Sequence, residues 1–333
     1  MSKRGRAARS QLARLALPLL LVVPGCASAQ AKPDLASSPA STPANATADT
    51  AALRTTLGRI VAAHHGVVGY SIRNLDTGEE LSLRGDETFP TASLIKVPIL
   101  VTLYDLVEKG KISLDDPLTI LSIDKVPGSG VMQFLHDGAT VTVHDAAWMM
   151  STVSDNTATN LLLDRIIIRR VWEKMESLGL QHTKVHSKTF LRISSVAMDS
   201  SAKYGLGVAT PNEMVHLFTL MAEGKAVSPA ADSAMLDILE HNTDNTLLQR
   251  YLDGVRAAHK TGAVDAARTE CSLFYLRTRV VACVFTKENQ DQRWILDSEP
   301  QVTMARMGAA IAKAWGLPDS ASVAEPTTAG SGR

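Results

Sequence analysis

A serine and a lysine stand three residues apart in the stretch 91–100, whose sequence is TASLIKVPIL. If this stretch begins a helix, Ser93 Oγ and Lys96 Nζ share one face and come within hydrogen-bonding reach. A serine hydroxyl becomes a useful nucleophile when a base takes its proton, and a lysine can be that base when burial or positive charge lowers its pKa. The apolar run from Val97 to Leu106 predicts a buried helix. The pair is therefore a candidate nucleophile and base, although the spacing also arises by chance.

Two further stretches carry polar groups suited to act beside such a pair. Ser-Asp-Asn at 154–156 falls between two predicted helices, the first beginning near Thr142 and the second covering 157–168. His-Lys-Thr-Gly-Ala at 259–263 falls at the end of a predicted strand. There a lysine and a threonine can bind a carboxylate, while strand N–H groups face an oxyanion. Each stretch taken alone has an ordinary structural explanation, since Ser, Asp and Asn also cap helices.

The elements around these stretches predict an α+β fold. A helix over 51–65 precedes a hairpin of two strands, 67–73 and 80–84, and helical patterns dominate from Ser93 to about residue 245. The apolar runs that predict three later strands are 256–263, 270–276 and 280–287, followed by a last helix over 298–315. Strands at both ends predict one antiparallel sheet built from the two termini, with an all-helical subdomain beside it. We expect the active site in the crevice between them.

The first residues predict an export signal. Five Lys and Arg residues precede the apolar run 15–23, which is too short to span a bilayer. Two processing sites compete. Ala27-Ser28-Ala29 fits cleavage of a signal peptide over 1–29, whereas Val23-Pro24-Gly25-Cys26 resembles a lipobox that would lipidate Cys26.

Low-complexity segments flank the predicted domain. Residues 30–49 are mostly Ala, Ser, Thr and Pro, a composition that predicts a disordered linker. A tether of this kind fits a lipid anchor at Cys26, so we favour a membrane-anchored lipoprotein over a soluble periplasmic or secreted product. The composition of residues 319–333 also predicts a disordered tail, which leaves a folded domain over 50–318.

Composition limits the classes of partner. The chain has 333 residues, of which 45% are hydrophobic, enough for a packed globular core. Lys plus Arg and Asp plus Glu both total 34, so we expect no binding to nucleic acid. Cys271 and Cys283 lie on neighbouring predicted strands. Directly paired strands rarely hold a disulfide, so we expect two buried free thiols, although export permits a disulfide.

Together the three stretches resemble the motif set of class A β-lactamases and penicillin-binding proteins, Ser-x-x-Lys, Ser-Asp-Asn and Lys-Thr-Gly. Residues 126–131 and 153–162 also look like that family, and the resemblance covers roughly 50–318. It implies a three-layer α/β/α sandwich of the β-lactamase/transpeptidase type. We expect a monomer that needs no metal or other cofactor.

The resemblance implies three catalytic residues. Ser93 is the acylated nucleophile, Lys96 draws its proton, and Ser154 passes a proton to the leaving nitrogen. The implied chemistry is the opening of a cyclic β-lactam amide through an acyl-enzyme.

The resemblance also implies substrate-binding residues. Asn156 binds the side-chain amide of the substrate, Lys260 with Thr261 binds its carboxylate, and the backbone N–H groups of the nucleophile and of Ala263 form the oxyanion hole. Arg268 is a further candidate for carboxylate binding, but we favour the alternative of a solvated arginine on a hairpin.

One part of the family's pattern is missing. Efficient class A enzymes carry a glutamate in a Glu-x-x-Leu-Asn motif, where it activates the water that releases the acyl group. The family's spacing places this residue near Thr189-Phe190, but no Glu occurs between Glu176 and Glu213. Losing a general base typically costs about 100- to 10,000-fold. We therefore expect slow deacylation, unless Asp199 or Lys96 serves as the second base.

Other functions remain as alternatives to a β-lactamase-like serine hydrolase. A D,D-peptidase or penicillin-binding esterase would share the motifs but act on peptidoglycan peptides, and a non-catalytic envelope lipoprotein would retain the fold as a binding module. A zinc hydrolase would rest on His182 and His186, but no His-x-His-x-Asp motif occurs. A Ser-His-Asp hydrolase would need a Gly-x-Ser-x-Gly elbow, which is also absent.

Overall fold

The computed structural model describes residues 49–324. The predicted signal peptide, the Cys26 lipidation site and the linker up to residue 48 lie outside these residues, as does the tail from 325. Within 49–324, no helix is both long enough and apolar enough to cross a membrane.

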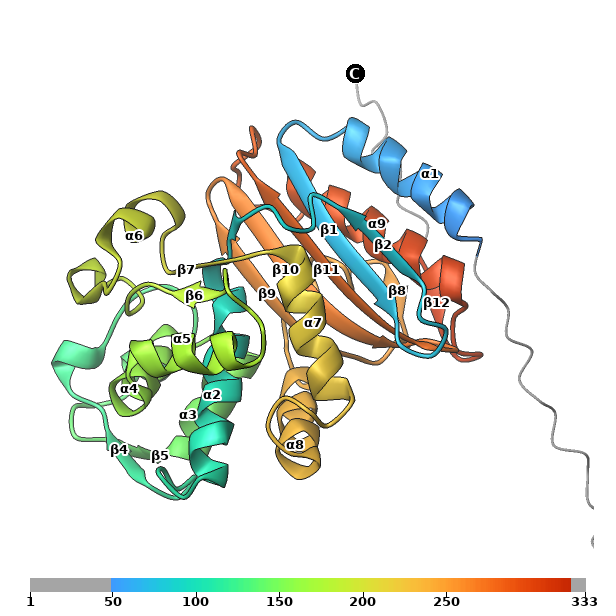
Figure 1. The fold of residues 1–333 in the computed structure, drawn as a ribbon. Helices are drawn as coiled ribbons and strands as arrows, with labels where there is room; N and C mark the ends of the chain where they lie inside the picture. Colours follow the sequence, from blue (N-terminus) through green and yellow to red (C-terminus); the bar gives the residue numbers. More distant parts are fainter. Residues whose placement is uncertain (1–48, 325–333) are drawn as a thin grey trace, which may run out of the picture. The chain divides into compact units, whose positions relative to one another are not determined.

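A five-stranded antiparallel sheet forms the framework (Figure 1), with the strand order β2-β1-β11-β10-β9. Its strands are β1 (Val67–Asn74), β2 (Glu80–Leu83), β9 (Ala257–Val264), β10 (Ala267–Tyr275) and β11 (Arg279–Lys287). The first two come from the N-terminal part and the other three from the C-terminal part. The predicted sheet built from both ends of the domain is confirmed, and β9 forms one of its edges.

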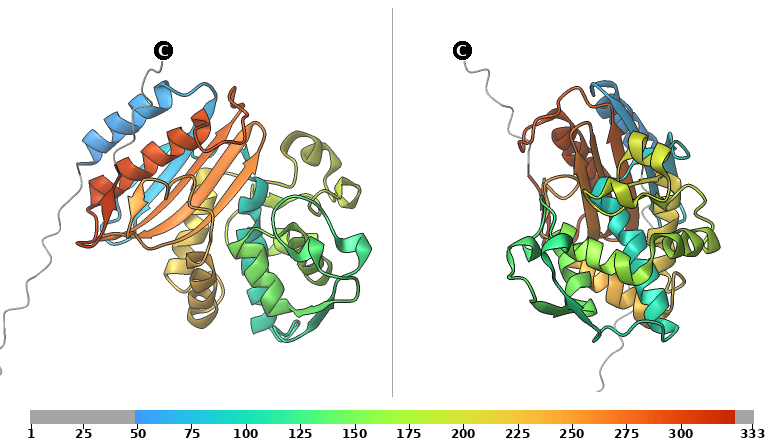
Figure 2. Two further views of the ribbon diagram at one scale, coloured as in Figure 1. Left: turned by 180° about the vertical axis from the view of Figure 1, so that it is seen from behind. Right: turned by 90° about the vertical axis from the view of Figure 1, so that its left-hand side faces the viewer.

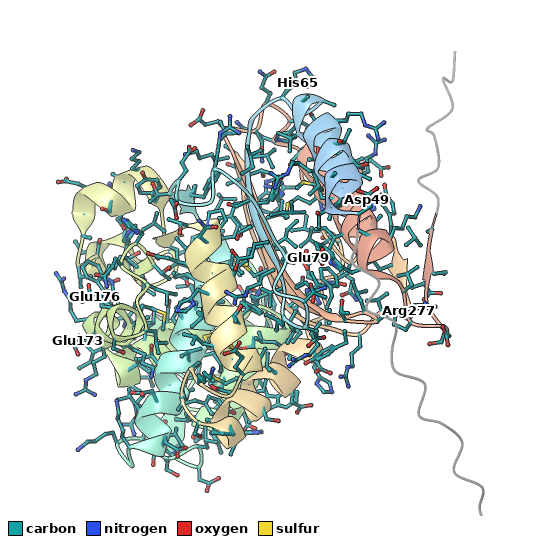
Figure 3. The ribbon with its side chains drawn as sticks, turned by 45° about the vertical axis from the view of Figure 1, so that its right-hand side comes forward. Asp49, His65, Glu79, Glu173, Glu176 and Arg277 are labelled. Carbon is teal, nitrogen blue, oxygen red and sulfur yellow. A yellow bond between two sulfur atoms is a disulfide. The ribbon has the colours of Figure 1, made fainter. Side chains whose placement is uncertain are left out.

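Two helices cover one face of the sheet and contact each other (Figure 2): α1 (Thr50–Ala62) and α9 (Glu299–Trp315). Leu57 of α1 and Ile311 of α9 are fully buried against sheet residues such as Ile72. Asp49 caps α1 by accepting a hydrogen bond from Ala52 N at 2.9 Å. Figure 3 labels Asp49 and His65 near the two ends of this helix.

Helices from the middle of the chain lie on the other side of the sheet or beside it (Figure 1). They are α2 (Lys96–Glu108), α3 (Val143–Thr152), α4 (Asn156–Ile166), α5 (Ile168–Ser177), α6 (Met198–Tyr204), α7 (Pro211–Ala222) and α8 (Pro229–Glu240). Of these, α7 packs on β1, β10 and β11, and α8 packs on β9. Every residue of α2 from Lys96 to Leu106 is buried, as its apolar run predicts. One apolar core on each face makes the fold the predicted three-layer sandwich.

Short elements complete the fold. They are β3 (Phe89–Pro90), β4 (Pro117–Thr119), β5 (Thr140–Thr142), β6 (Lys184–Val185), β7 (Gly207–Ala209), β8 (Leu252–Asp253), β12 (Ser322–Val323) and four 3₁₀ turns, η1 (Ala92–Ile95), η2 (Ser122–Asp124), η3 (Met132–Phe134) and η4 (Arg192–Ser194). Because β12 pairs with β8, ordered structure continues past the predicted domain end at 318. The expectation of a disordered tail from 319 is therefore wrong for these residues.

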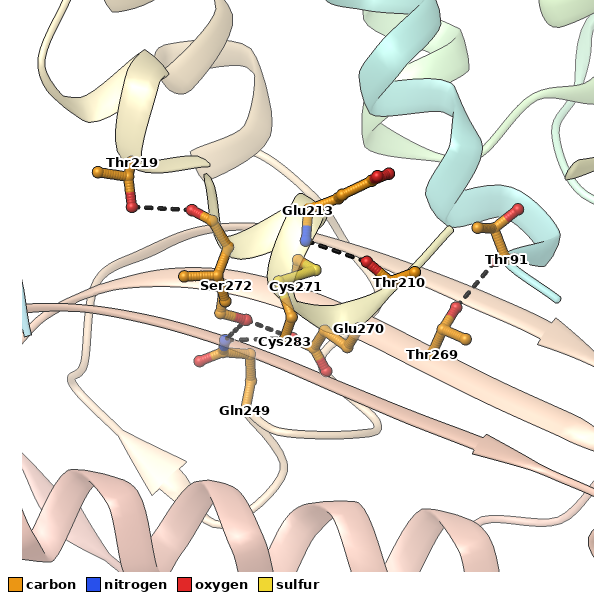
Figure 4. Close-up of a disulfide and its surroundings, with 11 residues drawn as sticks. Thr91, Thr210, Glu213, Thr219, Gln249, Thr269, Glu270, Cys271, Ser272 and Cys283 are labelled. Carbon is orange, nitrogen blue, oxygen red and sulfur yellow. Dashed lines mark hydrogen bonds between the residues drawn. A yellow bond between two sulfur atoms is a disulfide. The ribbon is translucent and has the colours of Figure 1, made fainter. Parts of the chain in front are cut away.

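Cys271 and Cys283 form a disulfide (Figure 4), so the prediction of two free thiols is wrong. The residues lie directly opposite each other on β10 and β11, with their Cα atoms 4.1 Å apart. Opposed residues of an antiparallel pair point their side chains to the same face, so the two sulfur atoms meet. Both side chains are fully buried.

Candidate active site

The nucleophile candidate lies on a 3₁₀ turn rather than on the first turn of an α-helix. This turn, η1, covers Ala92–Ile95, and α2 begins at Lys96. The sheet holds its start, because Thr269 Oγ1 donates to Thr91 O at 2.8 Å (Figure 4). A Cβ on Gly262 of β9 would lie 2.3 Å from Thr91 O, so only glycine lets the strand pass this close. The first and third motifs are therefore in direct contact.

Lys96 lies at the centre of the first two motifs. Its Nζ donates to Ser154 O at 2.6 Å, to Ser154 Oγ at 3.1 Å and to Asn156 Oδ1 at 2.9 Å. The side chain is almost fully buried. Burial first, and then the ammonium group of Lys260, hold the pKa of Lys96 well below its ordinary value. These are the conditions under which a lysine gains a neutral form able to accept a proton.

The expected contact between Ser93 and Lys96 is not formed. Lys96 Nζ bonds the three oxygens of the second motif, and within 49–324 no hydrogen bond joins it to Ser93 Oγ. Ser154, whose φ is +56°, is held in the left-handed region between α3 and α4. Strained backbone of this kind often occurs at functional sites. Hydrogen bonding thus connects Lys96 to the expected proton relay, and Ser93 remains half-buried nearby.

Asp155 holds the second motif together, a role that its sequence position alone did not reveal. Its Oδ1 caps α4 by accepting from Ala158 N at 2.9 Å. Its Oδ2 accepts from Val131 N at 2.7 Å and from Met132 N at 2.8 Å. Gly130 lies against this carboxylate, where a Cβ would come within 2.2 Å of it. The Pro-Gly-Ser-Gly loop over 127–130 is therefore fixed beside Asn156.

A cavity of about 620 Å³, called here the Ser93 cavity, opens between the sheet edge and the helical subdomain. Three of the predicted site residues line it, Ser93, Asn156 and Ala263. Phe190 and Trp294 also line it, and both side chains are mostly exposed. The cavity therefore has an apolar, aromatic rim around a polar floor, as expected of a small-molecule site.

The third motif lies on the edge strand β9. Lys260 is 1% exposed, and its Nζ donates to Thr261 O at 2.9 Å. Burial lowers the pKa of Lys260 to about 8, against the opposing effect of nearby carboxylates. Ala263 is exposed at the end of β9, where N–H groups on the outer edge lack a strand partner. That placement suits an oxyanion hole.

Thr261 and Arg268 line a second cavity of about 240 Å³ rather than the Ser93 cavity. The expectation of a solvated hairpin arginine is wrong, because Arg268 is 2% exposed. Its guanidinium donates to the carbonyls of Val264 and Ala267 and stacks on Trp294, 4.6 Å from the ring centroid. The side chain is already engaged by the hairpin that carries it.

Thr189 occupies the place where the missing glutamate was expected. Its backbone N–H donates to Asn160 Oδ1 at 2.8 Å, and Asn160 Nδ2 donates to Thr189 O at 3.1 Å. Thr189 lines the Ser93 cavity, and its buried Oγ1 has no hydrogen-bond partner among the described residues. Asp199 is exposed on α6 and does not line this cavity. Thr189 therefore brings no carboxylate to the cavity wall at this position.

The two histidines considered as zinc ligands make separate contacts. His182 Nδ1 lies 2.8 Å from Glu213 Oε1, and His186 Nδ1 lies 3.1 Å from Gly205 O. Across residues 49–324, no three His, Cys, Asp or Glu side chains are grouped as metal ligands.

Comparison with known sequences supports this reading of the motifs. A family model described as the β-lactamase enzyme family matches residues 52–315. The β-lactamase regulatory protein BlaB of Streptomyces cacaoi is 32% identical over 107 residues, which cover 30% of this chain and 32% of BlaB. The β-lactamase CARB-4 of Pseudomonas aeruginosa is 26% identical over 200 residues, covering 59% and 67% of the two chains. These alignments thus span from about a third to two thirds of the relatives' lengths.

Solved structures match over nearly their whole length. The β-lactamase from Sphaerobacter thermophilus has a TM-score of 0.71 and 27% identity, covering 81% of this chain and 99% of that one. A mutant of PBP-A, solved as an acyl-enzyme complex with penicillin G, has a TM-score of 0.70 and 25% identity. It covers 80% of this chain and 96% of that one.

Proposed function

We propose that this chain, which belongs to the β-lactamase enzyme family, is a serine hydrolase that opens β-lactam amides through an acyl-enzyme on Ser93 and deacylates slowly. The observation that carries the proposal is the arrangement of Lys96. This lysine is buried, its pKa is lowered, and it is hydrogen-bonded to Ser154 and Asn156 beside the cavity that Ser93 lines.

Acylation needs one proton to move from the nucleophile to the leaving group. Neutral Lys96 takes the proton of Ser93, whose Oγ forms a bond to the lactam carbonyl carbon. The N–H groups of Ser93 and Ala263 stabilise the oxyanion. When the C–N bond breaks, the nitrogen receives a proton from Ser154, and Ser154 recovers one from Lys96, 3.1 Å away. Asn156 binds the substrate's side-chain amide.

Deacylation needs a water and a base on the other side of the ester. In an efficient class A enzyme a glutamate fills this role. Here the corresponding position holds Thr189, whose hydroxyl is far too weak a base at neutral pH. Lys96 remains as a poor substitute base, so the acyl-Ser93 ester persists.

Labelling with a fluorescent penicillin tests both steps. We expect rapid covalent labelling of the wild-type chain, slow release of the label, and no labelling of Ser93→Ala. Ser129→Ala is the matched control, because Ser129 lines the same cavity but has no assigned role. Loss of label from the wild type at the rate of an efficient β-lactamase would contradict slow deacylation. Labelling of Ser93→Ala would contradict the assignment of the nucleophile.

A D,D-peptidase or penicillin-binding esterase is the second candidate, and Thr189 is the observation that favours it. An enzyme that forms but does not quickly hydrolyse an acyl ester behaves as a penicillin target. The similarity to PBP-A, a mutant of which was captured as a penicillin G acyl-enzyme, is in line with this candidate. Release of D-alanine from a stem-peptide mimic, lost in Ser93→Ala, would favour it over a β-lactamase.

Export to the bacterial envelope also belongs to the proposal. The signal-like residues 1–29 support it, and so does the Cys271–Cys283 disulfide, since disulfides persist mainly in oxidising compartments. We propose a lipid anchor at Cys26 and a monomeric enzyme. Metabolic labelling with a radioactive fatty acid, compared between wild type and Cys26→Ala, tests the anchor.

A further inference from the structure

Asp244 lies beside the two residues assigned to carboxylate binding. Its Oδ2 accepts a hydrogen bond from Thr261 Oγ1 at 2.7 Å, and its Oδ1 accepts from Thr246 Oγ1 at 2.6 Å. Burial opposes its ionisation, but these bonds and the charge of Lys260 outweigh it and hold the pKa of Asp244 below its ordinary value. Asp244 is therefore an anion at neutral pH.

The hydrogen bond to Asp244 changes what Thr261 can offer a substrate. A threonine hydroxyl has one proton and two lone pairs. Since the proton points to Asp244, only acceptor sites remain toward a ligand. A substrate carboxylate has no proton to donate, so it finds no partner in this hydroxyl.

The charges around Thr261 favour the same conclusion. Glu270, fully buried, lies directly across from Thr261 on the neighbouring strand. Both Asp244 and Glu270 act on the single ammonium of Lys260. Arg268 also lines the second cavity, but its guanidinium is bound to the carbonyls of Val264 and Ala267, and its charge is shared with the nearby carboxylates of Asp265 and Asp291. The charge of Lys260 is thus offset by two carboxylates, of which Asp244 lines the second cavity.

A bound substrate can reach Asp244. This residue lines the second cavity together with Thr261, and that cavity shares Ala263 and Trp294 with the Ser93 cavity. The two cavities therefore adjoin at the end of β9. The part of a substrate that extends from the scissile bond past Ala263 therefore comes close to the negative charge of Asp244.

We propose that Asp244 is a specificity-determining residue that makes the subsite beside Thr261 favour a neutral or cationic group over a free carboxylate. The inference rests on the proposed function, because it concerns the substrates that acylate Ser93. The expected substrates are amides or esters. The part of the substrate that lies beside Asp244 carries an amide, an ester or an amine in place of a free carboxylate, as in an internal or amidated peptide.

Acylation rates with three related probes test this proposal on the full chain. The probes are benzylpenicillin, its uncharged methyl ester and its 2-aminoethyl ester, which carries an ammonium. For the wild type we expect the two esters to label Ser93 at least as fast as the free acid. Asp244→Asn keeps the side-chain shape and removes the charge, so it should speed labelling by the free acid about tenfold or more and leave the methyl ester nearly unchanged.

Asp297→Asn is the matched control. It changes the net charge equally, but Asp297 is exposed, pairs with Arg250 and does not itself line the second cavity. In Asp297→Asn, the ratio of the Ser93 labelling rate with the methyl ester to that with benzylpenicillin should equal the wild-type ratio. An unchanged ratio in Asp244→Asn, or a wild type strongly favouring the free acid, would overturn this inference and leave the proposed function standing. No labelling of Ser93 by any probe would contradict both.

Discussion

At the scale of single residues, the site differs from an efficient β-lactamase at a position held by backbone contacts. Asn160 bonds both the N–H and the C=O of Thr189, so the backbone there is fixed whatever the side chain. Thr189 lines the Ser93 cavity, and its buried hydroxyl oxygen has no hydrogen-bond partner among residues 49–324. The proposed slow deacylation would therefore depend on one side chain in a framework that is already in place.

Thr189→Glu should restore part of the deacylation. A carboxylate at this point can take a proton from water beside the acyl group, and general-base catalysis is worth about 100- to 10,000-fold. We expect release of penicilloyl from Ser93 to speed up by about 100-fold, measured as loss of label by mass spectrometry. Thr189→Gln has nearly the same shape without the charge, and equal acceleration in that variant would contradict a general-base role.

The two buried lysines predict how acylation depends on pH. Lys96 acts in its neutral form, so the rate should rise with pH, and its lowered pKa brings this rise below the range of an ordinary lysine. Lys260 has a pKa of about 8, so above this pH it loses the charge that attracts an anionic substrate. Acylation by benzylpenicillin should therefore decline above about pH 8, whereas acylation by its uncharged methyl ester should not. Stopped-flow measurements give these acylation rates. If both compounds acylated more slowly above pH 8, deprotonation of Lys260 would not be the cause of the decline.

At the scale of elements, the junction of α3 and α4 determines whether the second motif keeps its shape. Asp155 caps α4 and also binds two backbone N–H groups of the neighbouring loop, all from a buried position. Asp49, by contrast, caps α1 from an exposed position with one hydrogen bond. The two caps look alike in sequence, but they differ in how many groups they satisfy.

Asp155→Ala should destabilise the fold by about 2–4 kcal/mol, because it leaves three N–H groups without their charged acceptor. Asp49→Ala should cost only about 1 kcal/mol, the usual value of an N-cap. Chemical denaturation of the two variants gives these free energies of unfolding directly. Equal costs would mean that Asp155 serves only as a helix cap.

At the scale of the whole molecule, the sequence predicts what depends on local pattern or on a motif. The five strands of the main sheet, the burial of α2 and the placement of the three motifs fall into this group. The disulfide, the burial of Arg268 and the bond between Thr261 and Asp244 do not, because each depends on which residues meet across strands or loops. The close approach of the 3₁₀ turn at Ser93 to Gly262 of β9 is likewise a contact between distant segments.

Two truncations test where the folded unit ends. A chain ending at 318 loses β12, which pairs through two residues with β8, and the exposed pair Arg277–Asp319. Since exposed ion pairs contribute about 0–1 kcal/mol, we expect its free energy of unfolding to fall by about 1 kcal/mol.

A chain ending at 297 loses α9, whose buried residues include the large apolar side chains Met304, Met307, Ile311 and Trp315. At about 1.5–3 kcal/mol each, these represent about 6–12 kcal/mol, comparable with the whole stability of a typical domain of about 5–15 kcal/mol. We therefore expect circular dichroism to show a cooperative thermal transition for the first truncation and none for the second. A folded chain ending at 297 would mean that the sheet and the central helices form a stable unit without their outer layer. The outer helical layer that contains α9 would then not be required for the rest of the domain to fold.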